Sequence, residues 1–185
     1  MANIQDYCDC LEKGGVILYP TDTIWGLGCD ATNEDACQKI KTIKNRSENQ
    51  SFIVLVDSER MLERFVPEFH PVCYDLIDHT EEPLTIIYPT SKNLAASVIG
   101  KDGSVGIRIT KDPFCIKLIQ KLKRPIVSTS ANISGKPHGK SLSEIDPTIK
   151  SKVDCFIEDN NKELNNPPSK IIKIDLDGTV KIIRK

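Results

Sequence analysis

The sequence of 185 residues contains seven cysteines but no Cys-x-x-Cys pair. An odd number of scattered cysteines indicates neither a disulfide framework nor a structural zinc site. The three histidines, His70, His79 and His138, form no metal-ligand motif such as His-Glu-x-x-His. The sequence therefore predicts reduced thiols, as in the cytoplasm, and no metal held by the protein.

Long apolar runs and an excess of one charge are also missing. No segment approaches the ~20 apolar residues of a membrane-spanning helix, and residues 1–6 lack the features of a signal peptide. We therefore expect a cytoplasmic protein without membrane contact. With 25 basic and 26 acidic residues the net charge is −1, and aromatic residues make up 5%. The composition predicts no extended nucleic-acid surface, so any basic site must be local.

The familiar phosphate-binding loops do not occur in the chain. It contains neither Gly-x-x-x-x-Gly-Lys-Ser/Thr nor Gly-x-Gly-x-x-Gly after a predicted strand. If the protein binds a nucleotide, it must do so with other residues.

What the sequence does contain is a polar stretch after a short apolar run. Residues 16–19 predict a buried strand, and the Thr-Asp-Thr that follows at 21–23 carries three polar side chains. Trp25, the only tryptophan, comes next, with glycines on either side of Leu27 that permit close approach of the backbone. We interpret residues 19–29 as a ligand-binding loop. Taken alone, the stretch also fits an ordinary turn between a strand and a helix.

A second stretch, residues 125–135, repeats this design. An apolar strand leads there into five polar residues, Ser128, Thr129, Ser130, Asn132 and Ser134. The sequence also offers three cations. Lys44 and Arg46 follow a predicted helix, and Arg108 lies on a predicted strand. Cations and hydroxyl groups together could hold a triphosphate. The alternative for Lys44 and Arg46 is a solvated helix end, where the helix dipole favours positive charge.

Strands and helices alternate along most of the chain, which indicates one α/β domain with a mixed twisted sheet. The patterns predict helices over 3–13, 33–44, 58–65, 71–78, 113–122 and 142–151, and strands over 16–19, 52–56, 83–88, 104–109, 125–128, 153–157, 170–175 and 179–183. Thr32 and Asp35 are predicted to form a capping box. The wholly apolar residues 52–56 predict a central strand, and Asp177-Gly178 predicts a hairpin turn.

At the polar stretches the sequence resembles the YrdC-like family, the threonylcarbamoyl-AMP synthases that begin synthesis of threonylcarbamoyladenosine (t6A) in transfer RNA. Residues 20–28 are similar to the family motif Pro-Thr-Asp/Glu-Thr-x-Tyr-Gly-Leu, and residues 104–108 to its Thr/Ser-Val-Gly-x-Arg strand. The Lys-x-Arg at 44–46 and the Ser-x-Asn at 130–132 resemble two further signatures, and residues 168–173 a fifth, weaker one. Together the motifs extend over nearly the whole chain in the family's order.

The resemblance implies a YrdC-like domain over residues 1–185, with helices around a twisted mixed β-sheet and a basic concave cleft. It implies that the chain forms L-threonylcarbamoyladenylate and pyrophosphate from L-threonine, bicarbonate or CO2, and ATP with Mg²⁺. It further implies contact with transfer RNA or double-stranded RNA and with downstream threonylcarbamoyl-transfer proteins.

The resemblance also implies roles for individual residues. Threonine would be bound by Thr23, Arg108, Ser128 and Ser169, with Arg108 pairing with its carboxylate. ATP would be bound by Lys44, Arg46, Gln50, Ser104, Ser130, Asn132, His138 and Arg184, among which Lys44, Arg46, Ser130 and Asn132 form the catalytic group.

Some positions depart from the family pattern. Ser47, Gln50 and Ser51 replace the usual residues of the loop after Lys-x-Arg, and Trp25 replaces a tyrosine. Lys170 and Lys173 replace a Thr and an Asp beside Ser169, and His138 stands where a hydroxyl residue is common. Two other functions stay open at this point. One is an RNA-binding module of the same fold, and the other is a paralogue that acts on a different carbamoyl adenylate.

Overall fold

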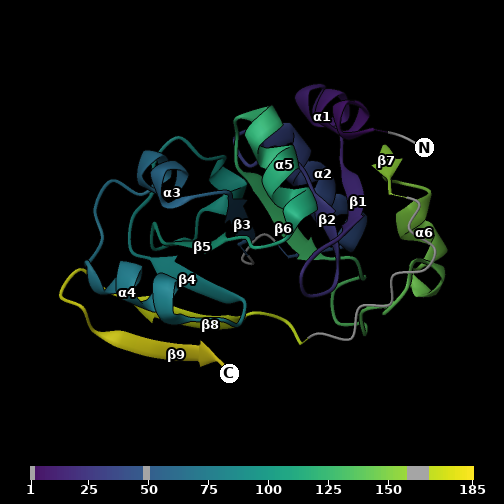
Figure 1. Ribbon diagram of the computed structural model, residues 1–185. Coiled ribbons are helices and arrows are strands. Elements are labelled where there is room, and N and C mark those ends of the chain that lie inside the picture. The colour runs from purple at the N-terminus through teal and green to yellow at the C-terminus, as the bar shows by residue number, and fades with distance from the viewer. Residues whose placement is uncertain (1–2, 48–50, 158–166) are drawn as a thin grey trace.

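The computed structural model of the protein describes residues 3–47, 51–157 and 167–185 (Figure 1). Its strands are β1 (Ile17–Pro20), β2 (Trp25–Gly28), β3 (Ile53–Val56), β4 (Leu84–Tyr88), β5 (Val105–Ile109), β6 (Ile126–Ser130), β7 (Cys155–Phe156), β8 (Lys170–Ile174) and β9 (Val180–Arg184). Its helices are α1 (Ile4–Glu12), α2 (Glu34–Lys44), α3 (Glu59–Phe65), α4 (Val72–His79), α5 (Pro113–Leu122) and α6 (Pro147–Lys150), with short 3₁₀ turns η1 (Ala96–Val98) and η2 (Leu142–Glu144).

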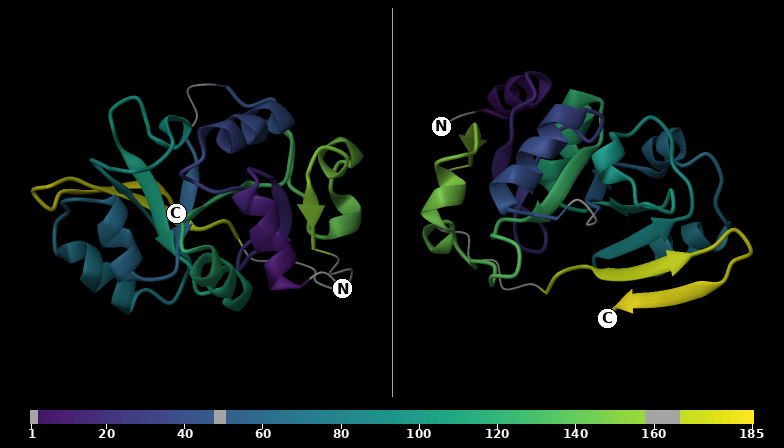
Figure 2. Two further views of the ribbon diagram at one scale, coloured as in Figure 1. Left: turned by 90° about the horizontal axis from the view of Figure 1, so that it is seen from above. Right: turned by 180° about the vertical axis from the view of Figure 1, so that it is seen from behind.

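The strands form one mixed sheet in the order β7-β1-β2-β6-β3-β5-β4-β8-β9. β3 lies in the middle of this order, parallel to β5 and antiparallel to β6. Residues 54–56 of β3 are buried, which confirms the predicted central strand. Helices cover both faces, since α1 and α5 pack together on one side of β2 and β6 and α2 lies on the other (Figures 1 and 2).

Local signals fix most helix boundaries. Helix α5 follows Asp112, whose side chain accepts a hydrogen bond from the backbone of Cys115, and Pro113 occupies the first turn. Helix α1 begins with a capping box at Asn3. The capping box predicted at Thr32 is wrong, because the side chain of Asn33 accepts from the backbone of Ala36 and so caps α2 one residue later.

Part of the predicted ligand loop is a strand. Trp25–Gly28 forms β2, which pairs antiparallel with both β1 and β6. The glycine at 28 has a packing role there, because a Cβ at this position would lie 2.7 Å from the ring of Tyr19 and 2.9 Å from the carbonyl of Val127. β6 likewise extends to Ser130, beyond the predicted end at 128. The two polar stretches therefore lie side by side in the sheet.

The C-terminal end of the described chain forms the predicted antiparallel hairpin. β8 pairs with β9 through a turn in which Gly178 has φ +85°, a value that favours glycine. β8 in turn pairs parallel with β4, so the hairpin extends the main sheet (Figure 1).

The predicted helix over 142–151 is wrong in extent, since the structure has only η2 and the single turn α6 there.

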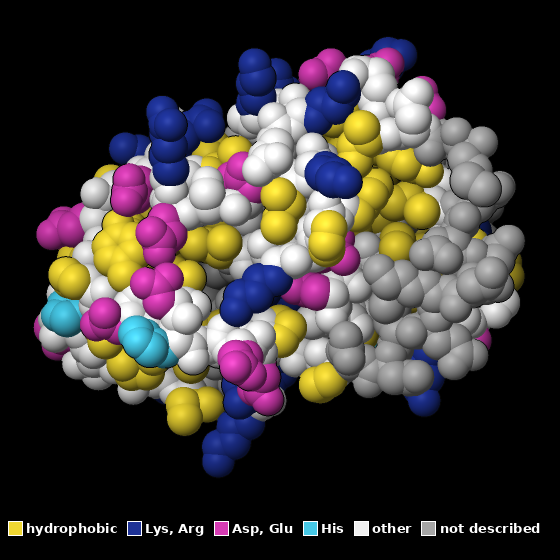
Figure 3. Space-filling model, viewed as in Figure 1, with side chains coloured by type: hydrophobic (Ala, Val, Ile, Leu, Met, Phe, Trp, Pro, Cys, Tyr) yellow, Lys and Arg dark blue, Asp and Glu magenta, His cyan; other side chains and the backbone are white. Residues whose placement is uncertain are grey.

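The surface carries charges of both signs. On the face shown in Figure 3, Lys and Arg side chains alternate with Asp and Glu, and no broad field of one sign covers it. Within the residues that the structure describes, no helix is both long and apolar enough to cross a membrane.

Candidate functional site

A pocket of about 410 Å³ lies where the two polar stretches meet the C-terminal hairpin. Its lining comes from the loop between β1 and β2, from β2 to β6, from the segment after α2, and from β8 and β9. Nine of the residues implied by the resemblance line it: Thr23, Arg46, Ser104, Arg108, Ser128, Ser130, His138, Ser169 and Arg184. Gln50 lies outside the described residues, and Lys44 and Asn132 are not among the lining residues.

The sheet register explains why distant residues meet in this pocket. Ser128 on β6 and Gly106 on β5 both pair with Ile53 on the central strand β3. Gly26 on β2 pairs with Ser130 on β6. Because residues opposite each other on neighbouring strands share a face, these five positions form one continuous wall of the pocket.

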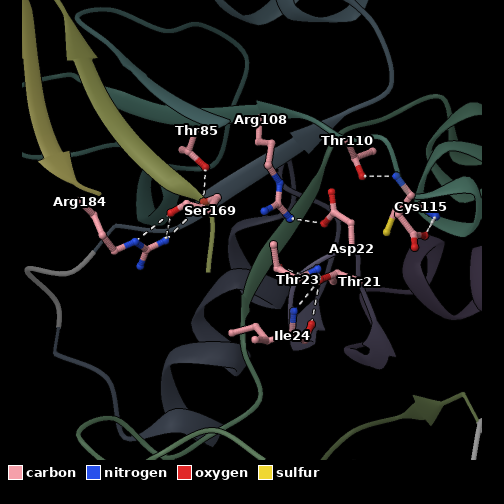
Figure 4. A network of polar contacts seen from close by, with 11 residues as sticks. Thr21, Asp22, Thr23, Ile24, Thr85, Arg108, Thr110, Cys115, Ser169 and Arg184 are labelled. Atoms are coloured by element: carbon pink, nitrogen blue, oxygen red, sulfur yellow. Dashed lines mark hydrogen bonds and ion pairs between the residues drawn. The ribbon is translucent and has the colours of Figure 1, made fainter. Parts of the chain in front are cut away.

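Arg108 is the most buried cation of the pocket. Its side chain is 4% exposed, and its Nη2 lies 3.1 Å from Oδ1 of Asp22, whose side chain is 17% exposed (Figure 4). Among the described residues its Nε has no hydrogen-bond acceptor. A buried guanidinium with an unused donor that lines a pocket is suited to bind a carboxylate or phosphate.

On the opposite side, Arg184 holds the start of β8. Its Nε and Nη2 donate to the carbonyl of Ser169 at 2.9 and 2.7 Å, and the Ser169 hydroxyl lies 2.8 Å from that of Thr85 (Figure 4). Burial, and secondly the charge of Arg108, lower the pKa of Arg184. Because the two arginines repel each other, an anion bound between them would be favoured.

Thr85 is a pocket residue that sequence reasoning missed. It is fully buried on β4 and lines the pocket next to Ser169. The available signal was a hydroxyl side chain inside an otherwise apolar strand, Leu-Thr-Ile-Ile-Tyr. A buried hydroxyl usually has a hydrogen-bond partner, and here the partner is distant in sequence.

The Lys-x-Arg pair points in two directions. Lys44 is 1% exposed, and its ammonium donates to the carbonyls of Ser130 and of Asn132, the latter at 2.7 Å, and to the side-chain oxygen of Asn132 at 3.2 Å. Burial, and secondly the charge of Arg46, lower the pKa of Lys44 to about 7. Lys44 therefore ties the end of β6 to α2, and its implied contact with ATP stays a prediction.

Arg46 instead reaches the pocket. Its guanidinium lies 5.0 Å from the ring centre of Phe52, and it donates to the carbonyl of Ser51 at 2.6 Å and to the Thr129 hydroxyl at 3.3 Å. Burial lowers its pKa. Contact with an aromatic ring and two oxygens fixes the direction of the guanidinium toward the lining residues.

Two residues of the first polar stretch lie away from the pocket. Trp25 is 1% exposed and is not a lining residue. The sulfur of Cys29 is buried 3.7 Å from that of Cys37, and this contact together with burial raises the pKa of the Cys29 thiol. A thiol of raised pKa is a poor nucleophile, so thiol chemistry at Cys29 is disfavoured.

The comparison with known proteins agrees with this geometry. The sequence model of the Sua5/YciO/YrdC family, described as telomere recombination, matches residues 9–185. The chain belongs to this family. A relative from Coxiella burnetii (strain RSA 493 / Nine Mile phase I), named threonylcarbamoyl-AMP synthase, is 32% identical over 157 residues, which are 84% of each chain.

Two solved structures of the family have the same fold. E. coli YciO superposes with a TM-score of 0.84 at 25% identity, covering 98% of this chain and 88% of that one. P. abyssi Sua5 complexed with L-threonine superposes with a TM-score of 0.85 at 28% identity over 92% of this chain. This match covers 50% of that Sua5 chain. The mixed sheet with flanking helices is therefore the fold of the Sua5/YciO/YrdC family.

Proposed function

We propose that the protein is a threonylcarbamoyl-AMP synthase, a nucleotidyltransferase that uses L-threonine, bicarbonate or CO2, and ATP. The observation that carries this proposal is the pocket in which Arg108, Thr23 and Ser128 meet Arg46 and Arg184. It joins a site for a small carboxylate to cations suited to a triphosphate. Relatives that align over most of the chain carry the same name.

The reaction needs no nucleophile from the protein. The amine of threonine takes up CO2 to form a carbamate, and a carbamate oxygen attacks the α-phosphorus of ATP. The new P–O bond forms as the bond to the β-phosphate breaks, and pyrophosphate leaves. The protein has to position the reactants and stabilise the charge of the transition state, which suits a pocket lined by hydroxyl groups and arginines.

Two groups of lining residues would bind the two substrates. Arg108 would pair with the threonine carboxylate, and Thr23, Ser128 and Ser169, which line the same pocket, would offer hydrogen-bonding groups to threonine. Arg46, Ser104, Ser130, His138 and Arg184 would contact the nucleotide. Asn132 and Lys44 would support Ser130 from behind, because the Lys44 ammonium donates to the backbone of both residues.

Mg²⁺ would enter as the complex with ATP. In the described part of the chain, no group of three or more His, Cys, Asp or Glu side chains could hold a metal ion, and neither Asp nor Glu is among the described lining residues. Phosphate oxygens are good ligands for Mg²⁺, and the ion would neutralise part of the phosphate charge. Whether the cleft as a whole is basic stays a prediction.

The product would serve t6A synthesis in transfer RNA. A carbamoyl adenylate is a mixed anhydride, so a downstream transfer protein must take it over before water hydrolyses it. RNA binding depends on clustered cations, and charges of both signs share the face in Figure 3, so a direct contact with transfer RNA would be local.

The test is pyrophosphate release by the purified protein with ATP and Mg²⁺, with and without L-threonine and bicarbonate. We expect release that depends on both. Release without threonine would contradict the proposed substrate. Release that responds to carbamoyl phosphate but not to threonine would favour the paralogue that acts on another carbamoyl adenylate. A folded protein that is inactive with both but shifts RNA in a salt-dependent manner would favour the RNA-binding module.

A further inference from the structure

The loop between β1 and β2 has hydrogen bonds whose direction can be worked out. The Thr21 hydroxyl oxygen lies 2.8 Å from the carbonyl of Ile24 and 2.9 Å from the hydroxyl of Thr23 (Figure 4). The same oxygen accepts from the backbone N–H of Thr23 at 3.0 Å and of Ile24 at 3.2 Å. Both hydroxyl groups are buried, with Thr21 2% and Thr23 4% exposed.

The two hydroxyl groups bring two hydrogens to these contacts. The carbonyl of Ile24 has none, so its contact with Thr21 is a hydrogen bond only if Thr21 donates. That uses the single hydrogen of Thr21. In the contact between the two hydroxyl groups, Thr23 must then be the donor to one lone pair of Thr21, and the two backbone N–H groups share the other lone pair. The Thr23 hydroxyl has spent its own hydrogen and can offer only lone pairs to a ligand in the pocket.

We propose that Thr21 is a positioning residue that fixes Thr23 as a hydrogen-bond acceptor, so that the ligand must present an N–H or O–H donor to it. This deepens the proposed function and rests on it. For threonine the donor we assign is the α-amino N–H, because the carboxylate on the same carbon would pair with Arg108, which lines the pocket beside Thr23. The N–H that remains on the carbamate can keep this hydrogen bond during the reaction.

The roles of the two threonines differ accordingly. Thr23 would contact the substrate, whereas Thr21 acts on the substrate through the Thr23 hydroxyl. Removal of the Thr21 hydroxyl frees the hydrogen of Thr23, which can then point into the pocket and oppose an N–H donor. This effect weakens the binding only of ligands that present an N–H donor, whereas general damage to the loop would weaken the binding of all ligands alike.

The experiment measures dissociation constants for two ligands, L-threonine and 3-hydroxybutanoate, by calorimetry or ligand-observed NMR. 3-Hydroxybutanoate keeps the carboxylate, the hydroxyl and the methyl group but lacks the amine. We expect Thr21→Val to raise the dissociation constant of threonine about 10-fold, the scale of one hydrogen bond. The dissociation constant of 3-hydroxybutanoate should change by less than ~2-fold. Thr21→Ser keeps the hydroxyl and should bind threonine like the wild type.

A double-mutant cycle of Thr21→Val and Thr23→Val gives the second measurement. Once Thr23→Val has removed the acceptor, adding Thr21→Val should cost no further affinity for threonine. Equal weakening of both ligands, additive losses in the cycle, or normal binding by Thr21→Val would each overturn the proposal. A wild type that does not bind threonine would overturn the proposed function, and the assignment of the amine with it.

Discussion

The pocket has two walls that differ in how firmly the sheet holds them. The central wall comes from β2, β3, β5 and β6, each of which is paired on both sides. The hairpin wall comes from β8 and β9, and every residue of β9 is exposed. Because local stability follows burial and contact density, the central wall should be preorganised, whereas the hairpin wall should open more readily.

The hairpin wall depends on a few attachments. The β4–β8 ladder supports one edge, Arg184 donates to the carbonyl of Ser169, and Lys173 lies 3.3 Å from Asp102. Exposed ion pairs of this kind contribute little. The contrast teaches that one wall can bind a substrate in a fixed geometry while the other adapts to it.

The largest effect should come from the central wall. Arg108→Gln removes its buried cation and leaves Asp22 without that partner, so we expect kcat/KM for threonine to fall at least ~100-fold, as for loss of one electrostatic stabiliser. Pyrophosphate release measures this, and Arg108→Lys, which keeps the charge, should lose less. A rate within ~3-fold of the wild type in a folded Arg108→Gln protein would contradict the assigned role.

A smaller effect is expected in the hairpin wall. Arg184→Ala removes the bonds to Ser169, so KM for ATP should rise about 10-fold while kcat changes less, because the wall still closes on the substrate when it is bound. The matched control is Lys181→Ala on the same strand, whose side chain does not line the pocket. Equal increases in KM for ATP in the two variants would show that the charge on the hairpin, and not the bond to Ser169, determines the affinity for ATP.

Behind the central wall, Lys44 should make stability depend on pH. Its pKa is lowered from 10.5 to about 7 in the folded protein, so between these values the unfolded chain binds a proton that the folded protein has released. The three oxygens around its ammonium favour the charged form and limit the effect. We expect the unfolding free energy of the wild type, relative to Lys44→Met, to rise by ~1 kcal/mol or more from pH 7 to pH 10. Urea titrations measure it, and a constant difference would contradict it.

The smallest effect is expected at Asp102, which precedes β5 and contacts Lys173 of the hairpin wall. Hydrogen bonds from Ser104, then contact with Lys173, lower the pKa of Asp102 to about 2. A lowered carboxyl pKa stabilises the fold above its unfolded value of 3.8, and this contribution is lost as the pH falls toward 2. Asp102→Asn should therefore cost less than ~1 kcal/mol at pH 7, and this cost should shrink as the pH falls through the folded pKa of about 2. A larger loss in thermal unfolding would mean that the contacts of Asp102 with Ser104 and Lys173 contribute more than their exposure indicates.

Much of the fold was predictable because its signals are local. Asp112 and Pro113 define the start of α5, and the unbroken apolar run of β3 indicates burial on both faces. Trp25–Gly28 was not recognised as a strand, because its glycines favour a loop. The strand pairs with its neighbour β1 and also with β6, about a hundred residues away, and the pairing with β6 has no local signature.

Prediction of the site from the sequence has the same limit. The motifs and the second polar stretch identified Arg46, Arg108 and Ser128, all of which line the pocket. They did not indicate that Lys44 turns toward the backbone of β6, because a helix end alone does not decide which side chain faces the ligand. Thr85 was missed since its partner, Ser169, lies 84 residues away along the chain, just before β8.

The open edge of β9 has a consequence for association between molecules. Val180, Ile182 and Ile183 are 47%, 60% and 49% exposed on a strand that, among the described residues, has a neighbour on one side only. An unpaired apolar edge invites another strand to add to it, and cationic side chains along such an edge oppose this. Lys181 and Arg184 would meet their own copies if two such edges paired. The cations of this hairpin thus also help to keep the sheet from growing into aggregates.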